Sequence, residues 1–344
     1  MDSDIALILL QDGVVNGAIY ALMALALVLV FAVTRVILIP QGELVAFSAL
    51  SYAALNEGRA PGSVWLLAGL GVAAFLMGLL SLRHAMTARA TLALAVECLL
   101  LPAAVSGLVL VLAPGKPPLA VQALLAVAIV TPMAPLLYRI VFQPMAEASV
   151  LVLLIAAVGV HLALVGLGLV VFGPEGSRAS ALLDTAFNAG PLFVQGQAVL
   201  ILLFTALLIA ALALFFGTTL AGKALRATAV NRLGAQLVGI GTSLSGRVAF
   251  SLAGLVGAAA GVLISPLTTV YYDTGFLIGL KGFVAAIIGG LVSYPAAALA
   301  AVLVGVVESV SSFYASAFKE VIVFAVIIPV LLWRSLRSPQ EDEE

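Results

Sequence analysis

Long apolar runs follow one another along almost the whole sequence, and they set the strongest limit on its fold. A helix that crosses the hydrocarbon core of a bilayer needs about 20 mostly apolar residues. Eleven candidate runs lie at 6–33, 36–55, 64–82, 91–112, 119–138, 150–172, 192–216, 248–265, 276–292, 296–316 and 321–333. Charged residues make up only 9% of the chain, against roughly 25% in a soluble domain. The sequence therefore predicts an all-α, polytopic transmembrane helical bundle with about 8–11 membrane segments.

Two of these runs, 36–55 and 276–292, carry residues that an ordinary membrane helix avoids. The first contains the stretch PQGE at 40–43, and the second contains Lys281 and the pair Gly289–Gly290. Non-helical or polar backbone at membrane depth is tolerated only where protein or water surrounds it. We therefore expect both segments to be broken or re-entrant, and the sequence leaves open whether they cross completely.

Basic residues divide unevenly between the two sides of such a bundle. With eleven crossings and an external N-terminus, the inner side holds Arg35, Arg83, Arg89, Arg139, Lys223, Arg226, Arg232, Arg247, Arg334 and Arg337. Only Arg59, Lys116 and Arg178 fall outside. Because Lys and Arg accumulate in cytoplasmic loops, we expect a cytoplasmic C-terminus. Residues 1–337 are interpreted as one transmembrane domain, and the acidic residues 338–344 as a cytoplasmic tail.

The segment 222–246 is the longest polar and basic interval between two apolar runs. Leu225, Ala229, Leu233 and Leu237 recur every four residues, which predicts a short amphipathic helix. Gly239 and Gly241 supply a helix stop. We expect this cytoplasmic segment to be the part of the chain that a partner protein contacts.

Signatures of enzymes are missing from the sequence. It has no HExxH, CxxC or GxSxG pattern, and its two histidines, His84 and His161, are too few and too far apart for a metal site. Without a GxxxxGK[ST] loop the chain holds no nucleotide of its own, and no basic run resembles a nucleic-acid-binding patch. We expect no catalytic residue and no metal, and any dependence on ATP must come from another polypeptide.

Polar residues inside the apolar runs are costly in hydrocarbon and tend to face an interior or a cavity. Asn16 and Tyr20 are four residues apart and share one helix face, and Gln41 and Glu43 open the second run. We interpret these four as candidates for a translocation path. Two alternatives stay open for Glu43, a path residue or a helix cap. For His161 a hydrogen-bonded neutral imidazole within the bundle is favoured over a role in the path. Two ion pairs are also expected, Glu308 with Lys319 and Glu97 with Arg89.

Four stretches, 13–49, 150–173, 222–267 and 274–316, resemble the permease subunits of branched-chain amino acid ABC importers. The resemblance implies a type II importer fold in a bacterial inner membrane, with the N-terminus periplasmic. It also implies a second, LivM-like permease subunit, two cytoplasmic ATPase subunits that carry ATP and Mg, and a periplasmic substrate-binding protein. No cofactor is implied on this chain.

The resemblance also assigns roles to particular residues. The cytoplasmic coupling loop of the family falls on Arg226, Ala227, Asn231, Ala235, Leu237, Gly239 and Ile240. Its small-residue packing positions fall on Ala253, Gly254, Gly257 and Gly261, and its Gly-Gly turn falls on Gly289 and Gly290. The sequence departs from the family pattern at 38–43 and 142–145, and the interval 83–118 is longer, as if one span were added.

Three hypotheses for function follow. The first is a permease subunit that forms the path for branched-chain amino acids or similar small solutes, driven by ATP hydrolysis on separate subunits. The alternative is a stand-alone secondary transporter or channel, which requires a partnered chain of ionisable groups at the membrane midplane. The third, an intramembrane enzyme, lacks any constellation of acid, base, nucleophile or metal ligands.

Overall fold

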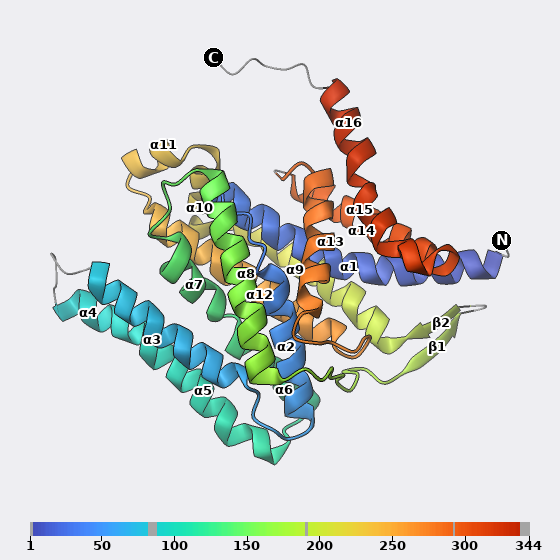
Figure 1. Cartoon of the computed structure of the whole chain (residues 1–344), viewed down its shortest axis with the longest axis horizontal. Helices are drawn as coiled ribbons and strands as arrows, with labels where there is room; N and C mark the ends of the chain where they lie inside the picture. The colour runs from blue at the N-terminus through green and yellow to red at the C-terminus, as the bar shows by residue number, and fades with distance from the viewer. Residues whose placement is uncertain (1–2, 82–87, 190–191, 292, 338–344) are drawn as a thin grey trace.

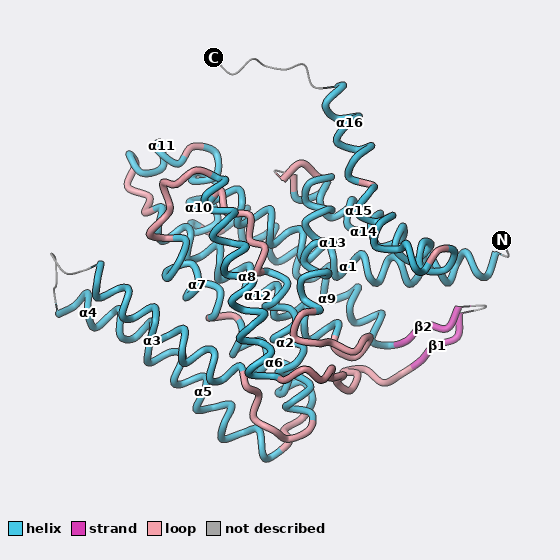
Figure 2. Tube along the Cα trace, viewed as in Figure 1, coloured by secondary structure: helices cyan, strands magenta, loops and turns pink. Residues whose placement is uncertain are grey.

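The computed structural model describes residues 3–81, 88–189, 192–291 and 293–337. The predicted acidic tail 338–344 and the predicted positions of Arg83 and His84 lie outside the described residues. Within them, nine helices are long and apolar enough to cross a membrane: Asp4–Thr34, Ser63–Leu80, Ala88–Gly115, Leu119–Phe142, Val150–Phe172, Gly196–Thr218, Thr242–Ile264, Tyr294–Tyr314 and Ser316–Trp333. The predicted polytopic helical bundle is confirmed (Figures 1 and 2).

The elements follow one another with short connections. In chain order they are α1 (Ser3–Thr34), α2 (Gln41–Asn56), α3 (Ser63–Ser81), α4 (Ala88–Ala95), η1 (Val96–Leu100), α5 (Leu101–Leu112), η2 (Ala113–Gly115), α6 (Leu119–Val130), α7 (Met133–Leu137), η3 (Tyr138–Phe142), α8 (Val150–Phe172), β1 (Ala186–Ala189), β2 (Leu192–Gln195), α9 (Gly196–Thr218), α10 (Leu220–Val230), α11 (Arg232–Leu237), α12 (Thr242–Ile264), α13 (Thr274–Ile288), α14 (Tyr294–Tyr314), η4 (Ser316–Phe318), α15 (Lys319–Ala325) and α16 (Ile327–Arg337). One prediction needs correction: residues 192–195 pair with β1 as a strand, so the helix expected at 192–216 begins at Gly196.

The bundle has two ends, which we call the hairpin end and the α10 end (Figure 1). At the hairpin end the Gln11 side chain near the start of α1 donates to the Phe193 carbonyl of β2 at 3.2 Å, and Asn56 at the end of α2 donates to Gln122 of α6 at 2.6 Å. At the other end the last turn of α1 packs with α9, α10 and α12 through an apolar cluster of Leu29, Val33, Phe216, Leu225 and Ala249. α1 therefore runs from the hairpin end to the α10 end.

Small residues let the central helices approach closely. A Cβ added at Gly13 would lie 2.6 Å from the Cα of Val306, and one at Gly17 would lie 2.6 Å from the Cα of Val302, so α1 lies backbone to backbone with α14. On α12, Gly254 meets the Thr131 carbonyl oxygen in the same way. α1, which makes these contacts, is also the most buried span: 89% of the residues in its most apolar stretch are buried, against 6% in the last span. Close packing of this kind holds helices together where lipid offers no hydrophobic drive.

α2 and α13 are short helices whose first turns meet in the middle of the bundle. The Gln41 side chain at the start of α2 donates to the Ala253 carbonyl halfway along α12 at 2.8 Å. Gly275 in the first turn of α13 packs directly on the Gly42 backbone. The 16 residues of α2 and the 15 of α13 span about 24 and 22 Å at 1.5 Å per residue, less than the ~30 Å hydrocarbon core. The prediction that both segments are broken is confirmed, since each reaches the middle through a non-helical stretch, 35–40 or 265–273.

Candidate functional site

Polar residues lie where the first turns of α2 and α13 meet. We call Gln41, Glu43 and His161 the midpoint cluster. Glu43 stands in the first turn of α2 and is completely buried. Its Oε1 atom lies 2.8 Å from Nδ1 of His161, which comes from the middle of α8. The Phe276 ring of α13 stacks on the imidazole with centroids 4.6 Å apart. Three segments that are distant in sequence thus converge on one carboxylate.

The position of the midpoint cluster gives it a defined electrostatic character. The first turns of α2 and α13 face each other, and a helix N-terminus carries a partial positive charge that favours a nearby carboxylate such as Glu43. Glu43 Oε2 and Gln41 Oε1 are buried and have no hydrogen-bond partner among the residues that the structure describes. The cluster therefore keeps unused acceptor oxygens beside two helix N-termini. The neighbouring cavity of about 320 Å³, lined by Leu44, Phe47 and Leu164, is apolar.

The other two predicted path residues lie elsewhere. Asn16 borders a cavity of about 250 Å³ at the hairpin end, together with Gln11, Asp12 and Gln195. Tyr20 is buried and donates its hydroxyl to Glu308 Oε2 at 2.5 Å. Of the four residues only Gln41 and Glu43 share a position, the first turn of α2, and their side chains contact different helices: Gln41 the Ala253 carbonyl of α12, and Glu43 the His161 ring of α8.

Tyr20 belongs to a second polar group, the α13 cluster, in which Tyr20, Lys281 and Glu308 are buried and Glu320 is partly exposed. Lys281 Nζ donates to Glu308 Oε1 at 2.5 Å and to Glu320 Oε1 at 3.1 Å. The predicted pair of Glu308 with Lys319 is wrong, because Lys319 follows the end of α14 and lies 4.0 Å from Glu320 instead. An apolar sequence pattern gives no signal for this pairing, since Lys281 comes from a different helix.

The segment predicted to contact a partner consists of two helices rather than one. The chain turns at Asn231, whose side chain accepts from the Gly234 amide at 2.8 Å and caps α11. The predicted single periodic face is therefore wrong: Leu225 packs into the bundle, whereas Leu233 and Leu237 are exposed. The predicted stop is present, because Gly239 takes a positive φ of 86° and the Ile240 amide donates back to the Ala235 carbonyl at 2.9 Å.

The α10–α11 segment is held on one side and open on the other. Thr228 contacts Ser245 of α12 at 3.2 Å, and Arg232 donates to the Ala146 carbonyl at 2.8 Å. Of the residues that the resemblance assigns to coupling, Arg226, Asn231, Leu237 and Gly239 are exposed, Ala227 and Ile240 are half-buried, and Ala235 is buried. Exposed apolar side chains accompany them: Leu220, Val230, Leu233, Leu237 and Val238. A surface of this kind marks an interaction site.

The positions predicted for helix packing lie at close contacts. Gly257 faces the Gln41 amide and Leu44, and Gly261 lies against the Val45 carbonyl and Ser48, so α12 packs on α2 at these glycines. At the Gly289–Gly290 turn, a Cβ on Gly289 would lie 2.5 Å from the Ala297 amide nitrogen, and Gly290 takes a φ of 85°. These glycines fix the positions of α2 and α14 around the midpoint and α13 clusters.

A third group of charges, which we call the rim cluster, lies at the α10 end. Glu97 Oε2 accepts from Arg139 at 3.0 Å and from Arg247 at 2.7 Å. The predicted pairing of Glu97 with Arg89 is wrong, because the π-helical turn η1 directs Glu97 toward η3 and α12. Among the described residues no group of three or more His, Cys, Asp or Glu is placed to hold a metal ion.

Comparison with known proteins agrees with the earlier resemblance. The family model described as "Branched-chain amino acid transport system / permease component" matches residues 9–331. LivH, a high-affinity branched-chain amino acid transport system permease protein of Salmonella typhimurium, is 34% identical over 206 residues, which cover 56% of this chain and 65% of LivH. BraD of Pseudomonas aeruginosa, with the same description, is 29% identical over 203 residues, which cover 57% of this chain and 66% of BraD. The matched part of the chain thus spans less than two thirds of these relatives.

Proposed function

The chain belongs to the family of branched-chain amino acid transport system permease components, and from this premise we propose that it is the membrane-spanning permease subunit of an ABC importer. The observation that carries the proposal is the family match, which extends over residues 9–331. The substrate would be a branched-chain amino acid or a similar small amphipathic solute. ATP and Mg would bind to separate ATPase subunits, since this sequence has no phosphate-binding loop.

The two ends of the bundle would serve different partners. The α10 end carries Lys223, Arg226 and Arg232 on its surface segment, and this basic character supports a cytoplasmic location. Two ATPase subunits would dock there, one of them on the exposed face of α10–α11. The hairpin end would be periplasmic and would receive the substrate-binding protein, and a second permease subunit would complete the path in the bacterial inner membrane.

The midpoint cluster supports a path through the centre of the chain. Glu43 Oε2 is an unpaired acceptor that matches the ammonium group of an amino acid, and the facing N-termini of α2 and α13 match its carboxylate. The cluster is closed in this structure, since Glu43 is fully buried. Movement of the α10–α11 segment would therefore have to separate α2 from α8 before a solute could pass.

The test is ATP-driven uptake by the complete transporter in proteoliposomes, with this chain, its permease partner, the ATPases and the binding protein. We expect uptake only with ATP. Gly239→Leu forces a side chain onto a position with a φ of 86°. This variant should uncouple substrate uptake from ATP hydrolysis, so that uptake falls at least about tenfold while hydrolysis continues. Gly217→Leu is the control, because Gly217 is also exposed and has open space around it. Uptake by this chain alone without ATP would instead establish a stand-alone transporter.

A further inference from the structure

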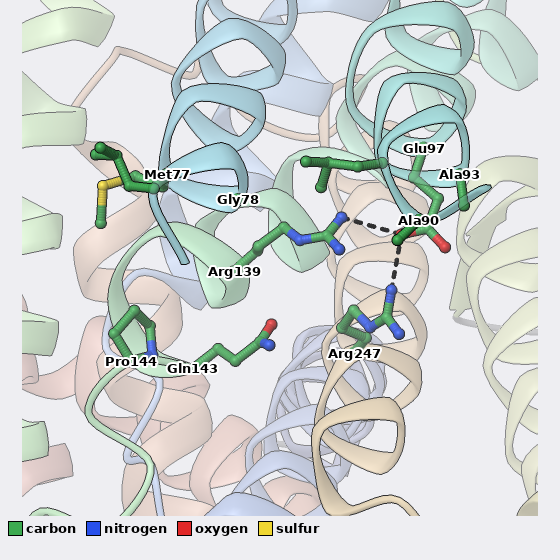
Figure 3. Close-up of a pocket in the computed structure, with 11 residues that line it drawn as sticks. Met77, Gly78, Ala90, Ala93, Glu97, Arg139, Gln143, Pro144 and Arg247 are labelled. Atoms are coloured by element: carbon green, nitrogen blue, oxygen red, sulfur yellow. Dashed lines mark hydrogen bonds and ion pairs between the residues drawn. The ribbon is translucent and has the colours of Figure 1, made fainter. Parts of the chain in front are cut away.

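Two cavities at the α10 end meet at the rim cluster, and Figure 3 shows the residues that line the larger one. Their volumes are about 660 Å³ and 290 Å³, and Glu97, Arg139 and Arg247 line both. The larger cavity lies between α3, α4 and η3, and the smaller lies between α5, α7 and α12. Neither the midpoint cluster nor the α10–α11 surface contributes to them, so they form a site separate from the proposed path.

The charges of the rim cluster are unbalanced. Both guanidinium groups donate through Nη1 to the same oxygen, Oε2 of Glu97. Two positive charges thus face one negative charge. Arg247 Nε, a donor, is also buried without a hydrogen-bond partner in the described part of the chain, whereas the unpaired Gln143 Oε1 is an acceptor and does not itself favour an anion. The site retains the capacity to bind a further anion.

Glu97 is the most exposed member of the cluster. Its side chain is 52% exposed, against 19% for Arg139 and 27% for Arg247. Arg139 has a second contact that holds it in place, because it also donates to the buried Cys98 sulfur at 3.1 Å. Since a half-exposed ion pair contributes little stability, Glu97 can be displaced at low cost while the guanidinium groups stay in place.

The π-helical turns η1 and η3 create this arrangement. Glu97 lies in η1 and Arg139 lies in η3, and each turn interrupts an otherwise regular membrane helix. Such turns are rare and are often found at functional sites. Their pairing across the cavity places both side chains at the same depth as Arg247, in the second turn of α12.

The rest of the lining is mostly apolar, and Gln143 in the larger cavity and Ser251 in the smaller one are the polar exceptions. The larger cavity adds Met77, Leu80, Ala90, Ala93 and Leu94, and the smaller adds Leu101, Pro132, Pro135, Leu136, Leu244 and Val248. Leu80, Leu101 and Leu244 are about half exposed on the surface of the bundle, so these walls continue into the surface that faces the bilayer. A ligand that fills the site must have an anionic head and apolar chains.

We propose that the rim cluster binds the phosphate headgroup of an anionic phospholipid, with its acyl chains in the two apolar cavities. The phosphate replaces Glu97 between Arg139 and Arg247, because a phosphate oxygen accepts from guanidinium groups as a carboxylate does and both arginines carry further donors. Basic pockets between membrane helices bind anionic headgroups in this way. The apolar walls favour a lipid over a soluble phosphate or an acidic segment of a partner protein.

The test is lipid binding by the purified full chain in detergent, measured by native mass spectrometry. Phosphatidylglycerol is the probe, phosphatidylcholine is the neutral comparison, and inorganic phosphate is the soluble competitor. We expect Arg139→Gln with Arg247→Gln to weaken phosphatidylglycerol binding about thirtyfold. Lys223→Gln with Arg226→Gln, which removes the same charge from exposed positions at the same end, should change binding less than about twofold. Glu97→Gln should strengthen it about fivefold, because the internal competitor is gone.

Equal binding of the two lipids would overturn the proposal, as would a Glu97→Gln variant that binds phosphatidylglycerol more weakly. Displacement of the lipid by inorganic phosphate at equal concentration would show that the ligand is the free anion. If the rim cluster is covered only when the ATPase subunits are added, it binds a protein surface in place of a lipid. If the double variant does not fold, Arg247→Gln alone decides: an expected loss of about fivefold supports the proposal and unchanged binding refutes it.

Discussion

The α13 cluster and the rim cluster are built from the same kinds of groups and differ in their surroundings. In the α13 cluster the side chains of Lys281 and Glu308 are 7% and 10% exposed, whereas Glu97 in the rim cluster is 52% exposed. Removing charges from water is costly and is compensated only if every charge keeps a partner. The buried cluster is therefore a structural joint, while the rim cluster can exchange a partner for a ligand.

The location of the α13 cluster shows what it joins. Tyr20, Lys281, Glu308 and Glu320 come from α1, α13, α14 and α15, and the Lys281 ammonium also lies 5.7 Å from the centre of the Tyr20 ring. The last membrane span has few buried residues of its own. Glu320, through Lys281, adds a polar attachment to the apolar contact that Val323 makes with the core.

The largest expected effect is the loss of Lys281. Lys281→Met leaves the Glu308 carboxylate buried without its partner, which should lower the free energy of unfolding by about 3–5 kcal/mol. The measurement is thermal unfolding of the purified full chain in detergent. Lys319→Met is the matched control, because the Lys319 side chain is 41% exposed and its loss should cost less than about 0.5 kcal/mol.

A second variant separates charge from packing at this position. Lys281→Met combined with Glu308→Met replaces the pair by apolar side chains and should recover most of the lost stability. If Lys281→Met unfolds at the same temperature as Lys319→Met, the cluster does not hold the last span, and the contrast with the rim cluster disappears.

Much of the fold could be predicted because it depends on local composition. The run at 150–172 coincides with α8, and the stretch PQGE with its unfavourable polar backbone correctly indicated that the second segment is broken. Glu43 and Gln41 could be singled out because a carboxylate and an amide are costly in hydrocarbon. The sequence predicts a hydrogen bond for His161, but it does not show that Glu43 is the partner.

The two wrong ion-pair predictions concern contacts between helices that are distant in the sequence. Glu308 and Glu97 were assigned to basic residues close in sequence, whereas their partners Lys281, Arg139 and Arg247 come from other helices. A single sequence carries no signal for such contacts. The break at Asn231 has a different cause. The apolar period predicts one continuous helix, whereas the Asn231 side chain accepts from a backbone amide and starts a new helix there.

An intermediate effect is expected where the interior is tightly packed. Gly42→Ala places a methyl group against the Gly275 carbonyl oxygen, and neither backbone can move aside easily. We expect a loss of about 1–3 kcal/mol in the free energy of unfolding. At the rim, the three atoms nearest to an added Cβ on Gly78 all belong to the flexible Leu94 side chain, and both residues line the cavity of about 660 Å³. Gly78→Ala should lose less than about 1 kcal/mol, since the leucine can shift into free space.

Gly159→Ala controls for the helix propensity of alanine, because Gly159 in α8 has nothing within 4 Å of an added Cβ. It should be as stable as the natural chain or more stable by up to about 1 kcal/mol. Equal losses for Gly42→Ala and Gly78→Ala would mean that the midpoint is no more tightly packed than the rim.

The smallest expected effect is the neutralisation of Glu97. Glu97→Gln removes one half-exposed carboxylate from two arginines that water or lipid can reach, so the free energy of unfolding should change by less than about 1 kcal/mol. Any change in the free energy of unfolding should depend on the salt concentration, because exposed ion pairs are screened within about 10 Å at 0.1 M ionic strength. Thermal unfolding at low and high salt, beside Lys281→Met as the buried comparison, measures both. A loss above about 3 kcal/mol that salt does not alter would show that Glu97 is held as rigidly as Glu308 and is not free to give way to a headgroup.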